Sequence, residues 1–263
     1  MLTRNRQLRM QMMGRFVAVA LWGLLGVGLV HVIAPSALAL TTCGTGTFNG
    51  TDVDFLQVQE ASSFGDPEPL FCSGPTAVAG NTLTFFPANF SAIAAGGSFD
   101  QTGSQLQAEI TTTSVMTIDQ ILITEFGDVV LTGIGTAATG TFVSMAGFVT
   151  VLEVLGAPVT PTVIGFLGTF TPSNLTALPG DLGTTLWSGS TLVDVASVVP
   201  NATKVQLSFD NDLTAFSEAG TTAKIQKKVG GPINITVIPE PATLALLCGG
   251  VLVMGLLRRS RRG

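Results

Sequence analysis

The stretch "IDQILITEFGDVVL", residues 118–131, decides the fold class of this chain. Ile121 and Ile123 stand two residues apart, Phe126 follows, and a second apolar run begins after Gly127-Asp128. Apolar residues at a period of two, many of them β-branched, predict a strand with one buried face. A Gly-Asp pair between two such runs predicts a turn. We therefore expect two strands here, joined at Gly127-Asp128.

The same pattern recurs along the middle of the chain. Residues 82–95 place Leu83, Phe85, Phe90 and Ile93 in alternation around a proline, and no window shows a convincing helical period. Eight or more short strands divided by Gly, Pro and Asn predict an all-β, antiparallel β-sandwich, of which the jelly roll is one form. The remaining runs are 104–115, with Leu106, Ala108 and Ile110 on one side, and 141–155, 162–170, 186–199, 204–216 and 221–238.

The N-terminal segment has the three parts of a secretory signal peptide. Four arginines precede an apolar run from Phe16 to Ile33, and Ala37-Leu38-Ala39 supplies small residues for cleavage. Residues 1–39 are therefore predicted to be removed, so that the mature chain begins at Leu40. The arginines are not adjacent, which favours the Sec machinery over twin-arginine export; an uncut N-terminal anchor is the alternative.

The C-terminal end, residues 239–263, combines three features in a fixed order. Pro239-Glu240-Pro241 holds the chain extended, because each proline fixes its own backbone and restricts the residue before it. Ala242–Leu257 is uncharged, and its 16 residues would form a helix about 24 Å long, short of a bilayer core of about 30 Å. We expect it to cross the inner membrane as a transmembrane helix. The arginines that follow predict a cytoplasmic tail: Arg258, Arg259, Arg261 and Arg262.

This order of Pro-Glu-Pro, short apolar helix and basic tail resembles the PEP-CTERM sorting signal of Gram-negative bacteria. The resemblance implies that an exosortase, a membrane-embedded protease, recognises Pro239, Glu240 and Pro241 and cuts near them. A sortase signal would need Leu-Pro-x-Thr-Gly before the helix, and a lipid anchor of the GPI type would lack the basic tail. An ordinary anchor that is never cut is the alternative. The implied route is export, transient anchoring in the inner membrane, and then the outer envelope, cell surface or extracellular matrix.

Parts of the body, residues 40–238, also resemble blocks of exported PEP-CTERM proteins of unassigned function. The similar blocks are "FFPANFSAIAAGGSFDQTGSQLQAEI", "EFGDVVLTGIGTAATGT" and "ATKVQLSFDNDLTAFSEAGTTAKIQKK". The resemblance implies a shared β-sandwich, with a Gly-Asp between strands in the middle block. It transfers no catalytic or binding residue.

The body is strongly acidic once both ends are set aside. All arginines lie outside residues 40–238, which hold four lysines and 16 acidic residues and so carry a net charge of −12. Such a surface repels phosphate backbones, so nucleic acid is not an expected partner. The two body cysteines, Cys43 and Cys72, suit an oxidising compartment. A disulfide between them is predicted to stabilise the fold by about 3 to 4 kcal/mol, with two free thiols as the alternative.

The body lacks the residues of most catalytic sites. The one histidine of the chain, His31, lies in the predicted signal peptide, so residues 40–238 contain none, which excludes His-dependent triads and His-ligated metals there. We therefore expect no enzyme activity, no cofactor and no metal site. The remaining carboxylate pairs are Asp52 with Asp54, on one face of a strand, and Asp210 with Asp212 in "FDNDL" (209–213), expected in a hairpin turn.

Two further groups of residues bear on function. Trp187 could stack on a sugar, although a single Trp in a sandwich is more often part of the core. Lys224, Lys227 and Lys228 are expected to line an edge strand and to hinder aggregation. The sequence thus favours an envelope or matrix protein with a structural or interaction role, with exopolysaccharide among its candidate partners. A carbohydrate-binding module is the alternative, and a glycosidase or lyase that uses carboxylates alone ranks last.

Overall fold

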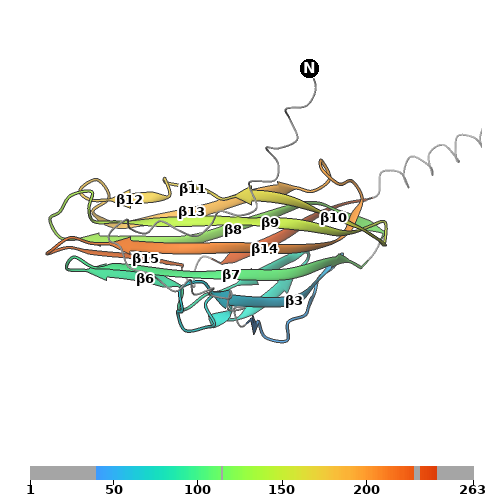
Figure 1. Cartoon of the computed structure of the whole chain (residues 1–263), viewed down its shortest axis with the longest axis horizontal. Helices are drawn as coiled ribbons and strands as arrows, with labels where there is room; N and C mark the ends of the chain where they lie inside the picture. The colour runs from blue at the N-terminus through green and yellow to red at the C-terminus, as the bar shows by residue number, and fades with distance from the viewer. Residues whose placement is uncertain (1–39, 114, 228–231, 242–263) are drawn as a thin grey trace, which may run out of the picture. The chain divides into compact units, whose positions relative to one another are not determined.

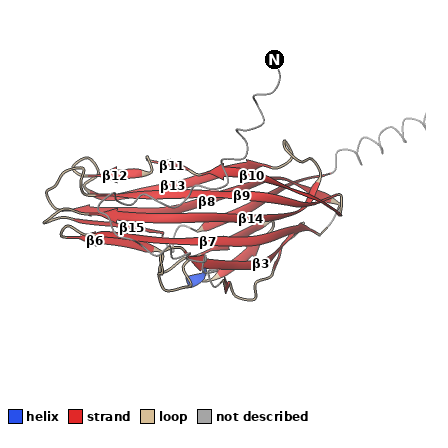
Figure 2. Cartoon of the chain, viewed as in Figure 1, coloured by secondary structure: helices blue, strands red, loops and turns tan. Residues whose placement is uncertain are grey.

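A computed structural model describes residues 40–113, 115–227 and 232–241 of the chain, and these residues form two antiparallel sheets. Figure 2 shows strands throughout this part, with one short 3-10 turn at Phe71–Ser73. The predicted all-β class and the pairing of two sheets are confirmed. The jelly-roll connectivity stays a prediction.

Sheet A has the strand order β1-β3-β7-β14-β9-β10, with β2 beside β3 and β12 beside β9. Figure 1 shows β7, β14 and β9 side by side, although β7 and β14 are far apart in the sequence. Its strands are β1 (Thr41–Thr42), β2 (Phe48–Asn49), β3 (Val53–Ser62), β7 (Phe99–Thr112), β9 (Gly140–Val154), β10 (Ala157–Leu167), β12 (Leu175–Ala177) and β14 (Ala202–Phe216).

Sheet B is built around its longest strand, β8. On one side β8 pairs with β13, and on the other side it pairs first with β16 and then with β15. Its strands are β4 (Thr76–Ala79), β5 (Thr82–Phe85), β6 (Ser91–Ala95), β8 (Met116–Thr132), β11 (Thr169–Thr171), β13 (Gly183–Asp194), β15 (Thr222–Lys227) and β16 (Ile233–Pro241).

The core lies between the two sheets and follows the period of two in the sequence. Along β14, for example, Val205, Leu207, Phe209 and Leu213 are buried, and they alternate with more exposed positions. Leu83, Phe85 and Phe90 are buried as predicted, and so are Leu106, Ala108 and Ile110; the same alternation leaves Ile93 half exposed. Four phenylalanines fill one region of the core, where Phe71 meets the edges or faces of Phe85, Phe90 and Phe209.

The predicted turn at Gly127-Asp128 is wrong, because β8 continues through both residues without a break. A Cβ atom at Gly127 would lie 2.4 Å from ring atoms of Trp187 and 2.2 Å from the carbonyl oxygen of Gln226. Glycine stands here because an indole ring and a neighbouring strand approach the backbone closely. Phe126 lies on the outer face of β8, opposite to the buried Ile121 and Ile123.

Two other local predictions fail for a related reason. "FDNDL" (209–213) forms no turn but lies within β14, which pairs with β7 and β9 along its length. The strand that carries Lys224 and Lys227 is not an edge strand, since β15 pairs with both β6 and β8. Lys227 is buried. In each case long-range pairing overrides the local signal of the polar residues.

Candidate functional site

The C-terminal strand β16 carries the predicted sorting residues and continues directly from the core. Ile233, Ile235 and Val237 are buried between the sheets, and Pro239 follows only two residues after the last of them. β16 lies between β8 and β5 up to Thr236. The Pro-Glu-Pro segment is thus an extension of a central strand of the described fold.

From Ile238 onward the strand pairs with β8 alone among the described residues. The register shifts between Ile238 and Pro239, and the paired positions beyond it are Pro239 with Ile118, Glu240 with Thr117 and Pro241 with Met116. Proline cannot donate a hydrogen bond to a sheet, so it is found where a strand has a free side or an irregularity. Both conditions hold here. The extended conformation predicted for this segment is therefore explained by its pairing and by its prolines.

Glu240 projects from this strand with an exposed side chain. Its backbone carbonyl oxygen lies 3.3 Å from the hydroxyl of Thr117, which also lies 3.1 Å from a carboxylate oxygen of Asp119. An open recess at the same end of the sandwich is lined by residues of β7, β8 and the β9–β10 turn, among them Met116, Thr117 and Leu155. The backbone of Glu240 is therefore fixed to β8 while its charge faces solvent.

The other predicted targeting features lie outside the described residues. These are Ala37 and Ala39 of the cleavage site, the apolar segment Ala242–Leu257 and the four terminal arginines. Leu40, the predicted first residue of the mature chain, is the first described residue and is partly exposed. Within residues 40–113, 115–227 and 232–241, no helix is long and apolar enough to cross a membrane.

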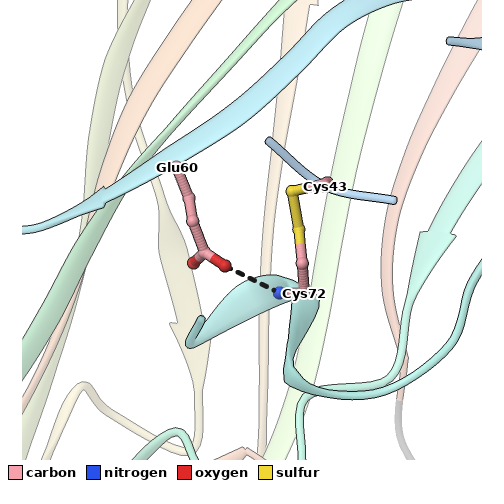
Figure 3. A group of neighbouring side chains, drawn as sticks. All are labelled: Cys43, Glu60 and Cys72. Carbon is pink, nitrogen blue, oxygen red and sulfur yellow. Dashed lines mark hydrogen bonds between the residues drawn. A yellow bond between two sulfur atoms is a disulfide. The ribbon is translucent and has the colours of Figure 1, made fainter. Parts of the chain in front are cut away.

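Cys43 and Cys72 form a disulfide in the structure, with a Cα–Cα distance of 5.4 Å. Figure 3 shows the carboxylate of Glu60, on β3, beside this bond. The Glu60 carboxylate accepts hydrogen bonds from the backbone N–H groups of Leu70, Phe71 and Cys72 at 2.7–3.1 Å, and from the hydroxyl of Ser104 at 3.2 Å. Disulfide and carboxylate together hold the 3-10 turn against the sheet.

The electrostatics of this group favour a structural role. Burial raises the pKa of Glu60, against the lowering effect of the three backbone N–H groups and Ser104. Two cysteines and a glutamate within 4.8 Å of one another could in principle ligate a metal. The two sulfur atoms are bonded to each other, however, and a metal ligand must be a thiolate. The arrangement therefore fits a structural cross-link and not a metal centre.

The two members of each predicted carboxylate pair follow one another along the chain, beside or within a strand of sheet A. Asp52 lies in the bend before β3 and accepts a hydrogen bond from the side chain of Asn81 at 2.9 Å, whereas Asp54 lies within β3. Asp210 and Asp212 lie on β14, two residues apart and on the same face. Burial raises the pKa of both, and for Asp212 the charge of Asp210 raises it further. Asp210 is exposed, whereas Asp212 is partly buried beside the hydroxyl of Ser144, and the charge of Lys227 lowers its pKa.

The structure also brings together three polar residues that the sequence did not single out as a group. Glu125, Asn211 and Lys227 are buried beside Trp187, which is itself only 4 % exposed and so cannot serve as a sugar platform. The alternation of apolar residues along each strand already indicated that these three side chains are buried. Each of the three occupies the apolar face of its strand, after Ile121 and Ile123, after Leu207 and Phe209, and after Ala223 and Ile225, respectively.

Fold and C-terminal strand together define the class: an all-β body whose last strand leads into a sorting signal. Residues 237–262 match the PEP-CTERM protein-sorting motif. The chain therefore carries a PEP-CTERM sorting motif in its C-terminal segment, as the resemblance predicted. The motif implies export, sorting toward the cell surface through a transient stay in the membrane, and processing by an exosortase.

Other comparisons add little to this identification. A search of curated proteins gives no match. Among solved structures, the enzymatically active domain of bacteriophage CBA120 tailspike protein 4 is 15 % identical with a TM-score of 0.18, and covers 60 % of this chain and 19 % of its own. A structure of infectious bursal disease virus, Gt strain, is 13 % identical with a TM-score of 0.14, and covers 72 % and 50 %. Likenesses this weak support no argument about fold or function.

Proposed function

We propose that this protein is a structural or interaction component of the outer envelope or extracellular matrix, and that it performs no catalysis there. The sorting motif supplies the route. The role is inferred from the way in which the body uses its polar residues, because the buried polar groups of the described part hold elements of the fold together. Glu60 is the main example, with four groups of one turn and one strand bound to its carboxylate.

The observation that carries the proposal is the direct passage from core strand to sorting motif. Val237 is buried in the core and Pro239 already belongs to the motif, so no linker separates the body from its sorting signal. In this proposal the folded body is presented at the membrane surface, and the exposed Glu240 is the polar group that an exosortase reads. Cutting after the motif then releases a body whose last strand remains paired to β8.

The composition of the body supports a role without catalysis. Residues 40–238 contain neither histidine nor arginine, so acid–base work would fall to carboxylates and the four lysines. Two carboxylates must face each other across a substrate to hydrolyse a glycoside. Asp210 and Asp212 instead follow one another along a single strand. The net charge of −12 also favours partners that are neutral or cationic.

Fractionation of a host that has an exosortase tests the sorting part of this proposal. Replacing Glu240 by Ala should leave a membrane-bound precursor, because the charged group between the two prolines is lost. Replacing the four terminal arginines should instead disturb the orientation of the tail, since clustered arginines remain cytoplasmic. Lys224→Met, on the body, is the matched control and should be processed like the wild type. Normal processing of the Glu240→Ala protein would contradict the proposed recognition.

A separate assay tests the role of the body. The mature wild-type protein should be recovered with washed envelopes or matrix, and incubation with host exopolysaccharide should release no new reducing ends. An Asp210→Asn/Asp212→Asn protein should behave in the same way. If the wild type released reducing ends and the double variant did not, the protein would be a glycosidase, which would contradict the structural role. Recovery of the wild type only as free protein in the medium would also contradict the proposal.

A further inference from the structure

Three reactive side chains meet in the core between the two sheets. Glu125 comes from β8 and Lys227 from β15, both in sheet B, whereas Asn211 comes from β14 in sheet A. The exposed fraction is 0 % for Glu125 and Asn211 and 3 % for Lys227. The Nζ atom of Lys227 and the side-chain amide of Asn211 both contact the same carboxylate oxygen of Glu125, Oε2. The amine and the amide are therefore held side by side.

Aromatic rings and glycines enclose this group. Lys227 Nζ lies 5.1 Å from the ring centre of Phe90 and 5.2 Å from that of Trp187. Gly127 leaves room for Trp187, and a Cβ atom at Gly189 would lie 2.9 Å from Cγ of Glu125. The sequence thus keeps two positions without side chains so that the indole and the glutamate can occupy the core. Such close packing holds the reacting groups in one arrangement.

If Glu125 and Lys227 formed only an ion pair, several buried polar atoms around them would lack a hydrogen-bond partner among the described residues. Oε1 of Glu125, Oδ1 of Asn211 and Nε1 of Trp187 are buried and have no hydrogen-bond partner among the described residues. Burying a charged pair is costly unless the remaining polar atoms are also bonded. Burial lowers the pKa of Lys227, against the raising effects of Glu125 and Asp212. Burial therefore favours the neutral amine of Lys227, the form in which Nζ is a nucleophile.

We propose that Lys227 and Asn211 join in an intramolecular isopeptide bond, with Glu125 as the catalytic acid and base. The neutral Nζ attacks Cγ of Asn211 and forms a C–N bond. Glu125 accepts the proton from Nζ and passes it to the side-chain nitrogen of Asn211. The bond between Cγ and that nitrogen then breaks, and ammonia leaves. One amine and one primary amide become one secondary amide and ammonia, with no oxidant, cofactor or energy source.

The chemistry agrees with what each residue type can do in this setting. A lysine becomes a nucleophile when desolvation removes its proton. A glutamate within hydrogen-bond reach of both nitrogens can move that proton. An amide is normally inert, so the step depends on fixed contact between the reactants, which can be equivalent to a very high local concentration. The product would tie sheet A to sheet B covalently, shortly before the strand that carries the sorting motif.

Mass spectrometry of the mature protein purified from an exporting host tests the bond. The intact mass should be lower than the sequence mass by one ammonia, after allowance for the disulfide. Trypsin cuts after free lysines, so a digest should contain residues 205–224 linked to residues 225–228 with the same loss. Separate, unlinked peptides from the wild type would overturn the proposal. A link that loses water instead, between Lys227 and Glu125, would overturn it as well.

Three variants assign the roles. Glu125→Gln keeps the shape of the side chain but cannot move the proton, and it should show the full, unlinked mass. Lys227→Met should also remain unlinked. Lys224→Met, on the same strand but with its side chain half exposed, is the matched control and should link like the wild type. A fully linked Glu125→Gln protein would remove Glu125 from the reaction. If a core variant fails to fold, the wild-type digest alone still decides whether the bond exists.

Discussion

Removal of the Cys43–Cys72 disulfide should destabilise the body by an amount that follows from its place in the chain. The two cysteines are 29 positions apart. In the chain-entropy model, closing a loop of that length lowers the conformational entropy of the unfolded state, which stabilises the folded state by about 3 to 4 kcal/mol. The replacement pair Cys43→Ala/Cys72→Ala should therefore lower the free energy of unfolding by about that amount. The Glu60 hydrogen bonds to the same turn should keep the native fold intact.

Trp187 offers a direct assay, because it is the only tryptophan after residue 39 and is buried in the core. Its fluorescence in urea should show one transition. With a denaturant slope of about 2 kcal/mol per molar, the midpoint should fall by about 1.5 to 2 M urea. The slope itself should rise, since an unfolded chain without the bridge exposes more surface.

Reduction of the wild-type protein is the matched control, and it should move the midpoint as far as the double replacement does. A change below about 0.5 kcal/mol in a protein shown to contain the bond would refute the entropic reasoning. A variant that does not fold at all would also refute the entropic reasoning, since the disulfide would then be required for the fold itself.

Further expectations concern pH and close packing. Burial raises the pKa of four carboxyl groups, so the folded state holds their protons more tightly than the unfolded state does. Stability should therefore fall as pH rises above their ordinary pKa values of 3.8–4.5. The melting temperature at about pH 5 should exceed that at about pH 8. A lower melting temperature at pH 5 would contradict this. The groups are Glu60, Asp66, Asp210 and Asp212. Gly127→Ala should cost about 1 to 3 kcal/mol in urea unfolding, because the new methyl meets Trp187 and backbone, whereas in Gly165→Ala on β10 the methyl would lie 4.0 Å from the carbonyl oxygen of Gly147, an ordinary contact. Equal stabilities of these two variants would contradict the packing argument.

The period of two in the sequence was sufficient to predict the fold class and much of the core. It placed Leu106, Ala108 and Ile110 on the buried side, and it identified most of the strands. It could not give the order of strands, because pairing such as β7 with β14 joins residues about a hundred positions apart. Such pairing depends on long-range packing, which local patterns do not contain.

The failures share one cause, which is the reading of polar or small residues as turns and edges. Gly127 is a packing glycine inside β8, and Asn211 and Lys227 are core residues of central strands. Continuing the alternation through these residues would have placed them inward. The sorting segment could be predicted because its information is local: two prolines, an apolar run and a basic tail in a fixed order.

The central claim is that the chain is exported and cut at its C-terminal sorting motif. The most direct measurement is the intact mass of the protein recovered from beyond the inner membrane of a host that has an exosortase. We expect a chain that begins at Leu40 and lacks the segment from Ala242 to Gly263. A recovered protein that retains its sequence through Gly263 would contradict it.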